Sequence, residues 1–129
     1  MSYPKILVVD DVRDIVEEMI QMLELLDLIA VGTGSVGSAI EQLSAHPEIR
    51  VVVSDLRLAG ESGTEIPARV AIDPRLAGRA FDYVFMTGDS DHTRISAAMP
   101  DSVVLTKPIN PRALIAQISS LLEGKAGTS

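Results

Sequence analysis

The stretch Val51-Val52-Val53-Ser54-Asp55 places three β-branched apolar residues directly before a hydroxyl and a carboxylate. A short, continuous apolar run is typical of a strand that is buried on both faces of a parallel sheet. Four more short apolar runs occur along the chain, so we expect five parallel strands. The other four are Ile6 to Val9, Leu28 to Val31, Tyr83 to Met86 and Val103 to Leu105.

Helical periodicity fills the segments between these runs. Apolar residues recur every three or four positions from Val12 to Leu26, from Val36 to Leu43 and from Pro111 to Leu122. Two weaker helices are expected, one starting near Thr64 and one over about residues 91–99.

Alternating strands and helices are typical of an α/β fold with a doubly wound parallel sheet. Because crossovers between parallel strands are right-handed, two helices fall on one face and three on the other. We therefore predict a five-stranded sheet with five helices. The strands, counted along the chain, lie in the order 2-1-3-4-5, as in flavodoxin-like folds.

Length and composition restrict the class of protein. The chain has 129 residues, 47% of them hydrophobic, which suits one globular domain, assigned to residues 1–123. Residues 124–129 have no apolar periodicity and are expected to form a flexible tail. Cysteine is absent, which excludes disulfides and thiolate metal sites. No segment is apolar for long enough to predict a signal peptide or a membrane span, so we expect a cytoplasmic protein.

The net charge of −7 comes without any cluster of lysine or arginine residues. Proteins that bind the phosphate backbone of nucleic acids need such a cluster. Direct binding to nucleic acid is therefore not expected.

Polar side chains follow four of the five predicted strands at the point where each strand ends. Because the carboxyl ends of parallel strands meet at one edge of the sheet, we expect these side chains to lie close together. They are Asp10 and Asp11, then Ser54 and Asp55, then Thr87, then Lys107.

Three carboxylates at one edge repel one another, by roughly 4 kcal/mol for each pair about 4 Å apart at an effective dielectric constant near 20. A divalent cation relieves this repulsion, and a set of hard oxygen ligands favours Mg²⁺ or Mn²⁺ over zinc. Carboxylates, Mg²⁺, a hydroxyl and a lysine together suit phosphoryl transfer. We expect Asp55 to be the nucleophile, with Lys107 and Thr87 each holding an oxygen of the transferred group.

With these residues in view, the chain resembles the receiver domains of two-component response regulators over nearly its whole length. The segments that carry the resemblance are Ile6 to Asp11, Val51 through Gly63, Val84 to Gly88 and Leu105 to Pro108. All four occur in order at strand ends.

The resemblance implies a role for each site residue. Asp55 matches the phosphoacceptor, and Asp10 and Asp11 match the acidic pair that organises Mg²⁺. The backbone carbonyl of Arg57 matches a further metal ligand. Thr87 matches the switch hydroxyl, and Lys107 matches the family's lysine, where the following bond to Pro108 is typically cis.

The resemblance also implies partners. The phosphoryl donor is expected to be a sensor histidine kinase or a phosphotransfer protein, and the effect is exerted on a downstream protein target. We expect a stand-alone signalling phosphoacceptor rather than an enzyme, monomeric or forming a weak or phosphorylation-dependent dimer, without a membrane or nucleic-acid partner. The weak fourth helix is expected to move on phosphorylation.

Four positions depart from the family pattern, among them Gly88, where alanine or serine is more common. Val104 stands where an inward-swinging aromatic residue is usual, which puts the rotating-ring readout in doubt. Ala59 replaces a usual proline, which predicts a more mobile loop. Arg57 predicts an altered lifetime of the phosphorylated state. An unchanged dephosphorylation rate in an Arg57→Ala variant would contradict this hypothesis.

Two other functions are weighed against this interpretation. Gly32, Gly34 and Gly37 match a dinucleotide-binding glycine pattern that follows a strand and opens a helix. Alternatively, the fold serves as a docking module without phosphorylation. His46 and His92 have no metal-ligand partner at a useful spacing, and we expect both to be exposed bystanders.

Overall fold

The computed structural model describes the backbone of residues 3–127 and the side chains of that range except residues 89–91 and 124–127. Five parallel strands form one sheet in the order β2-β1-β3-β6-β7. This is the predicted strand order, with the numbering shifted because a separate hairpin supplies β4 and β5. The strands are β1 (Ile6–Val9), β2 (Ala30–Thr33), β3 (Val51–Asp55), β6 (Asp82–Thr87) and β7 (Val103–Thr106).

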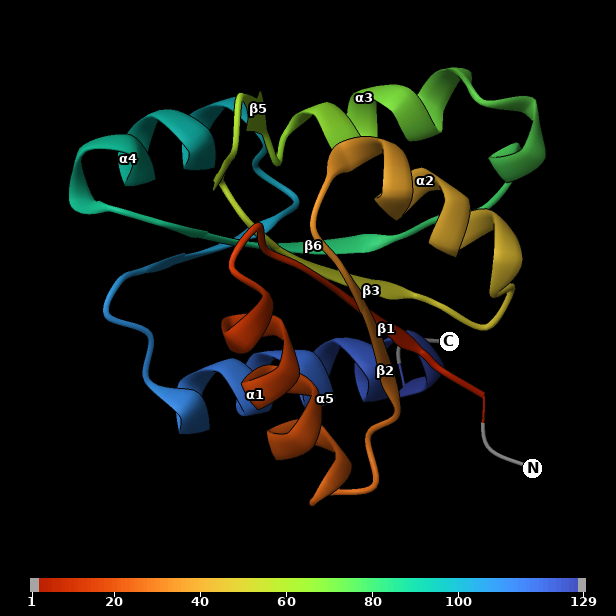
Figure 1. Ribbon diagram of the computed structural model, residues 1–129, viewed down its shortest axis with the longest axis horizontal. Coiled ribbons are helices and arrows are strands. Elements are labelled where there is room, and N and C mark those ends of the chain that lie inside the picture. Colours follow the sequence, from red (N-terminus) through yellow and green to blue (C-terminus); the bar gives the residue numbers. More distant parts are fainter. Residues whose placement is uncertain (1–2, 128–129) are drawn as a thin grey trace.

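Helices cover both faces of the sheet, two on one side and three on the other, as expected from right-handed crossovers (Figure 1). The helices α1 (Arg13–Glu24) and α5 (Pro111–Gly127) pack on one face. The other face carries α2 (Val36–Ala45), α3 (Glu65–Ile72) and α4 (Asp89–Ala98).

The core lies on both faces of the central strands β1 and β3. Alternate residues of a strand point to opposite faces, so Ile6 and Val8 pack in the layer with α1 and α5. Leu7 and Val9 pack in the layer with α2 and α3. All four are fully buried, which explains why β1 is apolar at every position.

Strand β2 begins two residues later than its apolar run predicts. Leu28 lies in the connection after α1, where its N–H donates to the carbonyl of Leu23. The strand instead includes Gly32, which α1 approaches closely: a Cβ at this position would lie 2.2 Å from Cγ1 of Val16. Close packing of α1 on β2 therefore requires glycine here.

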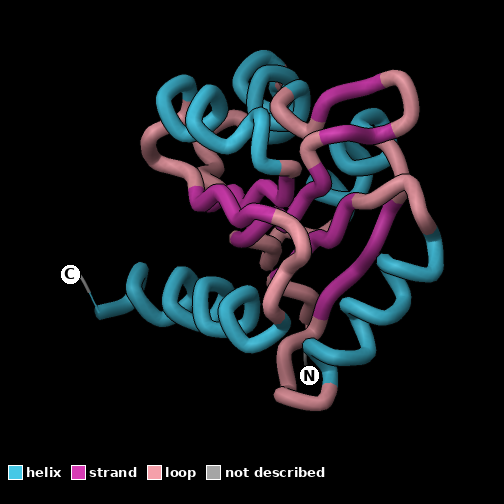
Figure 2. The backbone as a smooth tube through the Cα atoms, turned by 90° about the vertical axis from the view of Figure 1, so that its left-hand side faces the viewer, coloured by secondary structure: helices cyan, strands magenta, loops and turns pink. Residues whose placement is uncertain are grey.

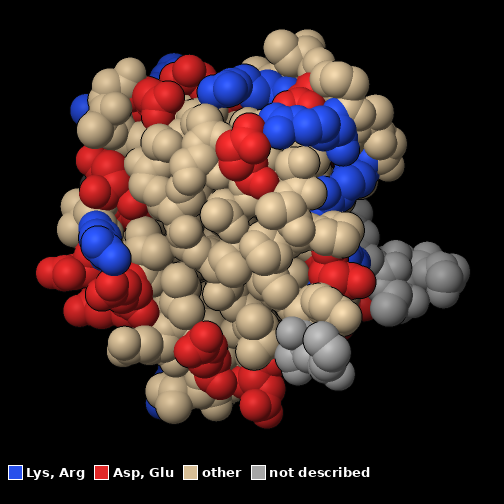
Figure 3. All heavy atoms as spheres, turned by 45° about the vertical axis from the view of Figure 1, so that its right-hand side comes forward, with Lys and Arg blue, Asp and Glu red and all other residues tan. Residues whose placement is uncertain are grey.

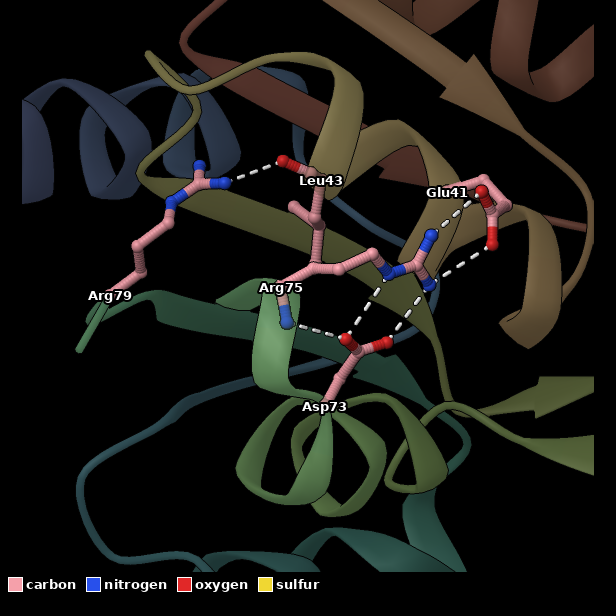
Figure 4. Close-up of polar contacts among 5 residues, drawn as sticks. All are labelled: Glu41, Leu43, Asp73, Arg75 and Arg79. Carbon is pink, nitrogen blue, oxygen red and sulfur yellow. Dashed lines mark hydrogen bonds and ion pairs between the residues drawn. The ribbon is translucent and has the colours of Figure 1, made fainter. Parts of the chain in front are cut away.

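Charged residues brace α2 against the segment that follows α3, the 3₁₀ turn η1 (Pro74–Leu76) (Figure 4). The guanidinium of Arg75 donates to both oxygens of Glu41, at 3.1 Å each, and to Oδ2 of Asp73 at 2.9 Å. These hydrogen bonds from Arg75 lower the pKa of Glu41 and of Asp73. The guanidinium of Arg79 donates to the Leu43 carbonyl at the end of α2.

Two predicted boundaries at the ends of helices differ from the structure. Helix α4 starts at Asp89 rather than near residue 91, and Ile95 is buried among its described side chains. The backbone of α5 stays helical to Gly127, beyond Leu122, where the predicted helical periodicity ends. The flexibility expected of residues 124–129 stays a prediction, and residues 128 and 129 lie outside the described residues.

The loop after Asp55 contains a hairpin that was not predicted. Strands β4 (Arg57–Leu58) and β5 (Glu61–Ser62) pair antiparallel through a two-residue turn. Gly60 in this turn has φ = 71°, in the left-handed region that favours glycine. The pair stands apart from the main sheet in Figure 2.

Candidate functional site

Three carboxylates meet at the carboxyl edge of the central strands. Asp10 directly follows β1, Asp55 is the last residue of β3, and Asp11 opens the turn into α1. One oxygen from each lies within 4.8 Å of the others. Asp10 and Asp55 are buried, whereas Asp11 is exposed, so the cluster opens to solvent on the Asp11 side.

Short contacts hold two of these carboxylates in place. Oδ1 of Asp10 accepts from the Val12 N–H at 2.9 Å. Oδ2 of Asp55 pairs with Nζ of Lys107 at 3.0 Å, and Oδ1 of Asp55 accepts from the Arg57 N–H at 3.4 Å. The residues that the sequence singled out on three separate strands therefore lie together, as expected of a single site.

Burial raises the pKa of Asp10 above its ordinary value of 3.8, and the neighbouring charges of Asp55 and Asp11 raise this pKa further. The Val12 N–H and the Lys107 ammonium act in the opposite direction. The charged form of Asp10 is thus disfavoured unless a cation shares the site.

Thr87 ends β6 beside this cluster and is 2% exposed. Its carbonyl accepts from the Lys107 N–H at 2.8 Å, which joins the ends of β6 and β7. Its Oγ1 is the buried side-chain polar atom that has no hydrogen-bond partner among the described residues. A buried hydroxyl without a partner costs about 1–3 kcal/mol, so this group is suited to a ligand oxygen.

The backbone around Asp55 is tightly packed. The Gly63 N–H donates to the carbonyl of Leu56 at 2.8 Å. A Cβ on Gly63 would lie 2.5 Å from the Asp55 carbonyl oxygen and 2.7 Å from Oγ of Ser54. Glycine is therefore required where the hairpin returns to the end of β3. The buried Ser54 hydroxyl donates to the Asp55 carbonyl, so it serves the backbone rather than a ligand.

The peptide bond between Lys107 and Pro108 is cis, as the resemblance implies. The bond directly follows the lysine that pairs with Asp55.

The donor set fits a hard divalent cation. Mg²⁺ prefers carboxylate and carbonyl oxygens and keeps part of its water shell. Three carboxylates on one side, with one of them open to solvent, match that preference. One cation here would also offset the repulsion that raises the pKa of Asp10.

The prediction that His92 is an exposed bystander was wrong. His92 lies in α4 and is half-buried, with Nε2 3.1 Å from the carbonyl oxygen of Val104. Val104 itself packs beside a buried cluster of Leu56, Phe85 and Ile95. His46 lies at the C-cap of α2 and is also half-buried.

The glycine pattern has a structural explanation. Gly32 lies within β2, where its missing side chain admits Val16 of α1. Dinucleotides bind where the strand order reverses in the sheet, and β2 is an edge strand. This placement disfavours the dinucleotide-binding alternative.

The molecular surface agrees with the acidic composition. On the face in Figure 3, acidic groups surround a broad uncharged area, and basic groups gather along one margin. Among residues 3–127, no helix is long and apolar enough to cross a membrane.

A family model described as "Response regulator receiver domain" matches residues 6–119, which include every site residue discussed above. A search of the curated proteins found no match.

Solved structures share the fold over nearly the whole chain. A response regulator receiver protein from Burkholderia phymatum is 27% identical, with a TM-score of 0.74 over 93% of this chain and 95% of that chain. A receiver domain protein from Clostridium thermocellum is 23% identical, with a TM-score of 0.80 over 98% and 99%. A CheY-like receiver domain protein from Methanospirillum hungatei JF-1 is 21% identical, with a TM-score of 0.80 over 99% and 100%.

Proposed function

The chain belongs to the response regulator receiver domain family of two-component systems, and on this premise we propose that Asp55 accepts a phosphoryl group in the presence of Mg²⁺. Receiver domains interact in general with histidine kinases or phosphotransfer proteins. We take such a protein to be the donor for this chain.

One observation supports the proposal above all: Asp10, Asp11 and Asp55 form a carboxylate cluster to which Lys107 adds a cation at 3.0 Å from Asp55. Three carboxylates with one ammonium leave a net negative site, which is suited to a divalent cation and a phosphoryl group together.

Asp10, Asp11, Asp55 and the Arg57 carbonyl would hold the Mg²⁺ ion. When bound, Mg²⁺ neutralises negative charge on the phosphoryl oxygens. Manganese has the same ligand preference and should substitute for it.

The chain's own residues account for the transfer. A carboxylate oxygen of Asp55 attacks the phosphorus of a phosphohistidine, a P–O bond forms, and the P–N bond breaks. The electron pair of that bond leaves with the imidazole of the donor, which takes up a proton. Lys107, freed from its pair with Oδ2, would then hold one phosphoryl oxygen.

Thr87 would hold a second oxygen. Its hydroxyl is buried beside the site without a partner among the described residues, so donation to a phosphoryl oxygen would satisfy it. Movement of Thr87 would displace the loop at Gly88 and helix α4, in which Ile95 is the buried residue among the described side chains 92–98. The altered surface would then change the affinity for a downstream protein target.

The test is intact mass spectrometry after incubation with acetyl phosphate. The wild-type chain should gain one phosphoryl group with Mg²⁺ and none with a chelator, and Asp55→Asn should gain none. A gain by both proteins, or by neither with Mg²⁺ present, would contradict the assignment. If a partner protein binds the chain equally with and without Mg²⁺ and also binds Asp55→Asn, the docking-module alternative is supported.

A further inference from the structure

A side-chain hydrogen bond joins the β4–β5 hairpin to helix α2. Oε1 of Glu61 accepts from the backbone N–H of Val36 at 3.1 Å. Val36 is the first residue of α2, and the first N–H groups of a helix have no partner within the helix. A carboxylate in this position gains both a hydrogen bond and the favourable end of the helix dipole.

This hairpin also carries the backbone that surrounds Asp55. Its first residue, Arg57, donates its N–H to Oδ1 of Asp55 and pairs across the hairpin with Ser62. Directly after the second strand, Gly63 returns to contact the Asp55 carbonyl, with no room for a side chain. A shift of the hairpin therefore moves groups that touch the phosphoacceptor.

The hairpin is short, and near its second strand the Ser62 N–H also donates to Oε2 of Glu65 at 2.7 Å. It consists of two strands of two residues each, and an isolated pair of this size is not stable by itself. Leu58 anchors one side of it in the core. The turn is exposed at Ala59 and Gly60, and Glu61, directly after it, joins this end of the hairpin to the start of α2.

We infer that Glu61 is a positioning residue of the metal site: by holding the hairpin against α2 it fixes Arg57, whose N–H binds Asp55. This inference rests on the proposed function, which makes Arg57 a metal ligand through its carbonyl. Residues that orient metal ligands without touching the metal commonly affect metal affinity. Glu61 acts through Arg57 and does not itself contact the carboxylate cluster.

The experiment measures Mg²⁺ affinity by calorimetric titration of the unphosphorylated chain, with Glu61→Ala, Glu61→Gln and Ser35→Ala as variants. Glu61→Ala should weaken Mg²⁺ binding about fivefold, which corresponds to the ~1 kcal/mol of one hydrogen bond. The rate of phosphorylation by acetyl phosphate should match the wild type at saturating Mg²⁺. The effect then lies in binding rather than in the transfer step.

Two further variants distinguish a loss of hairpin position from a loss of charge and from a general weakening of α2. Glu61→Gln keeps an acceptor but removes the charge, so it should retain most of the affinity if position matters. Ser35→Ala removes the other side-chain acceptor at the start of α2, the one for the Ser38 N–H, without touching the hairpin. It should lower the melting temperature and leave Mg²⁺ affinity unchanged.

Three outcomes would overturn the inference: equal affinity in Glu61→Ala and wild type, equal losses in Glu61→Ala and Glu61→Gln, or an equal loss in Ser35→Ala. The second outcome would indicate a long-range charge effect and the third a general weakening of α2. If the wild-type chain itself binds no Mg²⁺, the proposed function fails and this inference fails with it.

Discussion

The ammonium group of Lys107 lies 3.0 Å from Oδ2 of Asp55, although 52 residues separate the two in the chain. Adjacent strand ends bring them together, because β3 pairs with β6 and β6 pairs with β7. This contact places one positive charge against three negative ones.

Lys107 should compete with a divalent cation for the carboxylate cluster. We therefore expect Lys107→Ala to bind Mg²⁺ more tightly, by about threefold, since nearly half of this side chain is exposed and solvent weakens the pair. Calorimetric titration measures this change. Lys5→Ala, at the opposite end of β1, is the matched control and should leave the affinity unchanged; an unchanged affinity in Lys107→Ala would contradict the prediction.

Asp10→Asn should stabilise the metal-free protein by about 1 kcal/mol at neutral pH, because a buried charge near two like charges is removed. The asparagine oxygen can still accept from the Val12 N–H. The same variant should lose the stabilisation that Mg²⁺ gives the wild type. Urea unfolding with a chelator and with Mg²⁺ measures both effects, and lower stability of Asp10→Asn in the chelator would contradict the prediction.

The sign of the pH dependence follows from the raised pKa of Asp10. The folded state binds the proton more tightly than the unfolded state, so the free energy of unfolding falls as pH rises from about 3.8 through the folded pKa. The advantage of Asp10→Asn over wild type should therefore grow across this window and then stay constant. A constant difference at every pH would show that the carboxylate does not titrate abnormally.

Thr87→Val should raise the free energy of unfolding of the unphosphorylated protein by about 1 kcal/mol, since it removes a buried hydroxyl that lacks a partner among the described residues. With Mg²⁺ and beryllofluoride, a phosphoryl mimic, wild type should be stabilised more than Thr87→Val. Thermal unfolding under both conditions checks this. Thr87→Ser keeps the hydroxyl and should be stabilised as much as the wild type. Equal stabilisation of wild type, Thr87→Val and Thr87→Ser would show that the Thr87 hydroxyl does not bind the phosphoryl mimic.

His92→Ala should loosen helix α4 without unfolding the domain. The hydrogen bond to the Val104 carbonyl joins α4 to β7, and among the described side chains of this helix Ile95 is the buried one. Amide exchange of residues 92–98 should become about fivefold faster, as expected for loss of one hydrogen bond. Thr93→Ala, at the exposed neighbouring position, is the control; similar exchange in His92→Ala and wild type would show that the contact does not hold the helix.

The strand order and the main site residues could be predicted from the sequence, because the central strands are continuous apolar runs and the polar site residues directly follow them. Strand β1 is apolar at every position because both of its faces are buried. The edge strand β2 is less regular, because it includes Gly32 where α1 packs closely. The apolar run from Leu28 to Val31 therefore does not show where β2 begins and ends. Which strand ends are neighbours follows from handedness, and the convergence of Asp10, Asp55 and Lys107 follows from that order.

The remaining features depend on tertiary contacts that leave no periodic pattern. The β4–β5 hairpin has strands too short to show alternation, although its Ala-Gly turn is a local signal. It is held partly by Glu61, whose partner Val36 is 25 residues away. His92 binds a backbone carbonyl, and because every residue carries one, the sequence could not identify the partner.

Chemical trapping of the modified residue tests the phosphoacceptor assignment most directly. Borohydride reduces an aspartyl phosphate to homoserine, with release of phosphate, and tandem mass spectrometry of the digested protein then locates the converted position. After treatment with acetyl phosphate and Mg²⁺, we expect homoserine at position 55 and at no other aspartate. Conversion at Asp10 or Asp11, or none anywhere in a folded protein that binds Mg²⁺, would contradict the proposed function.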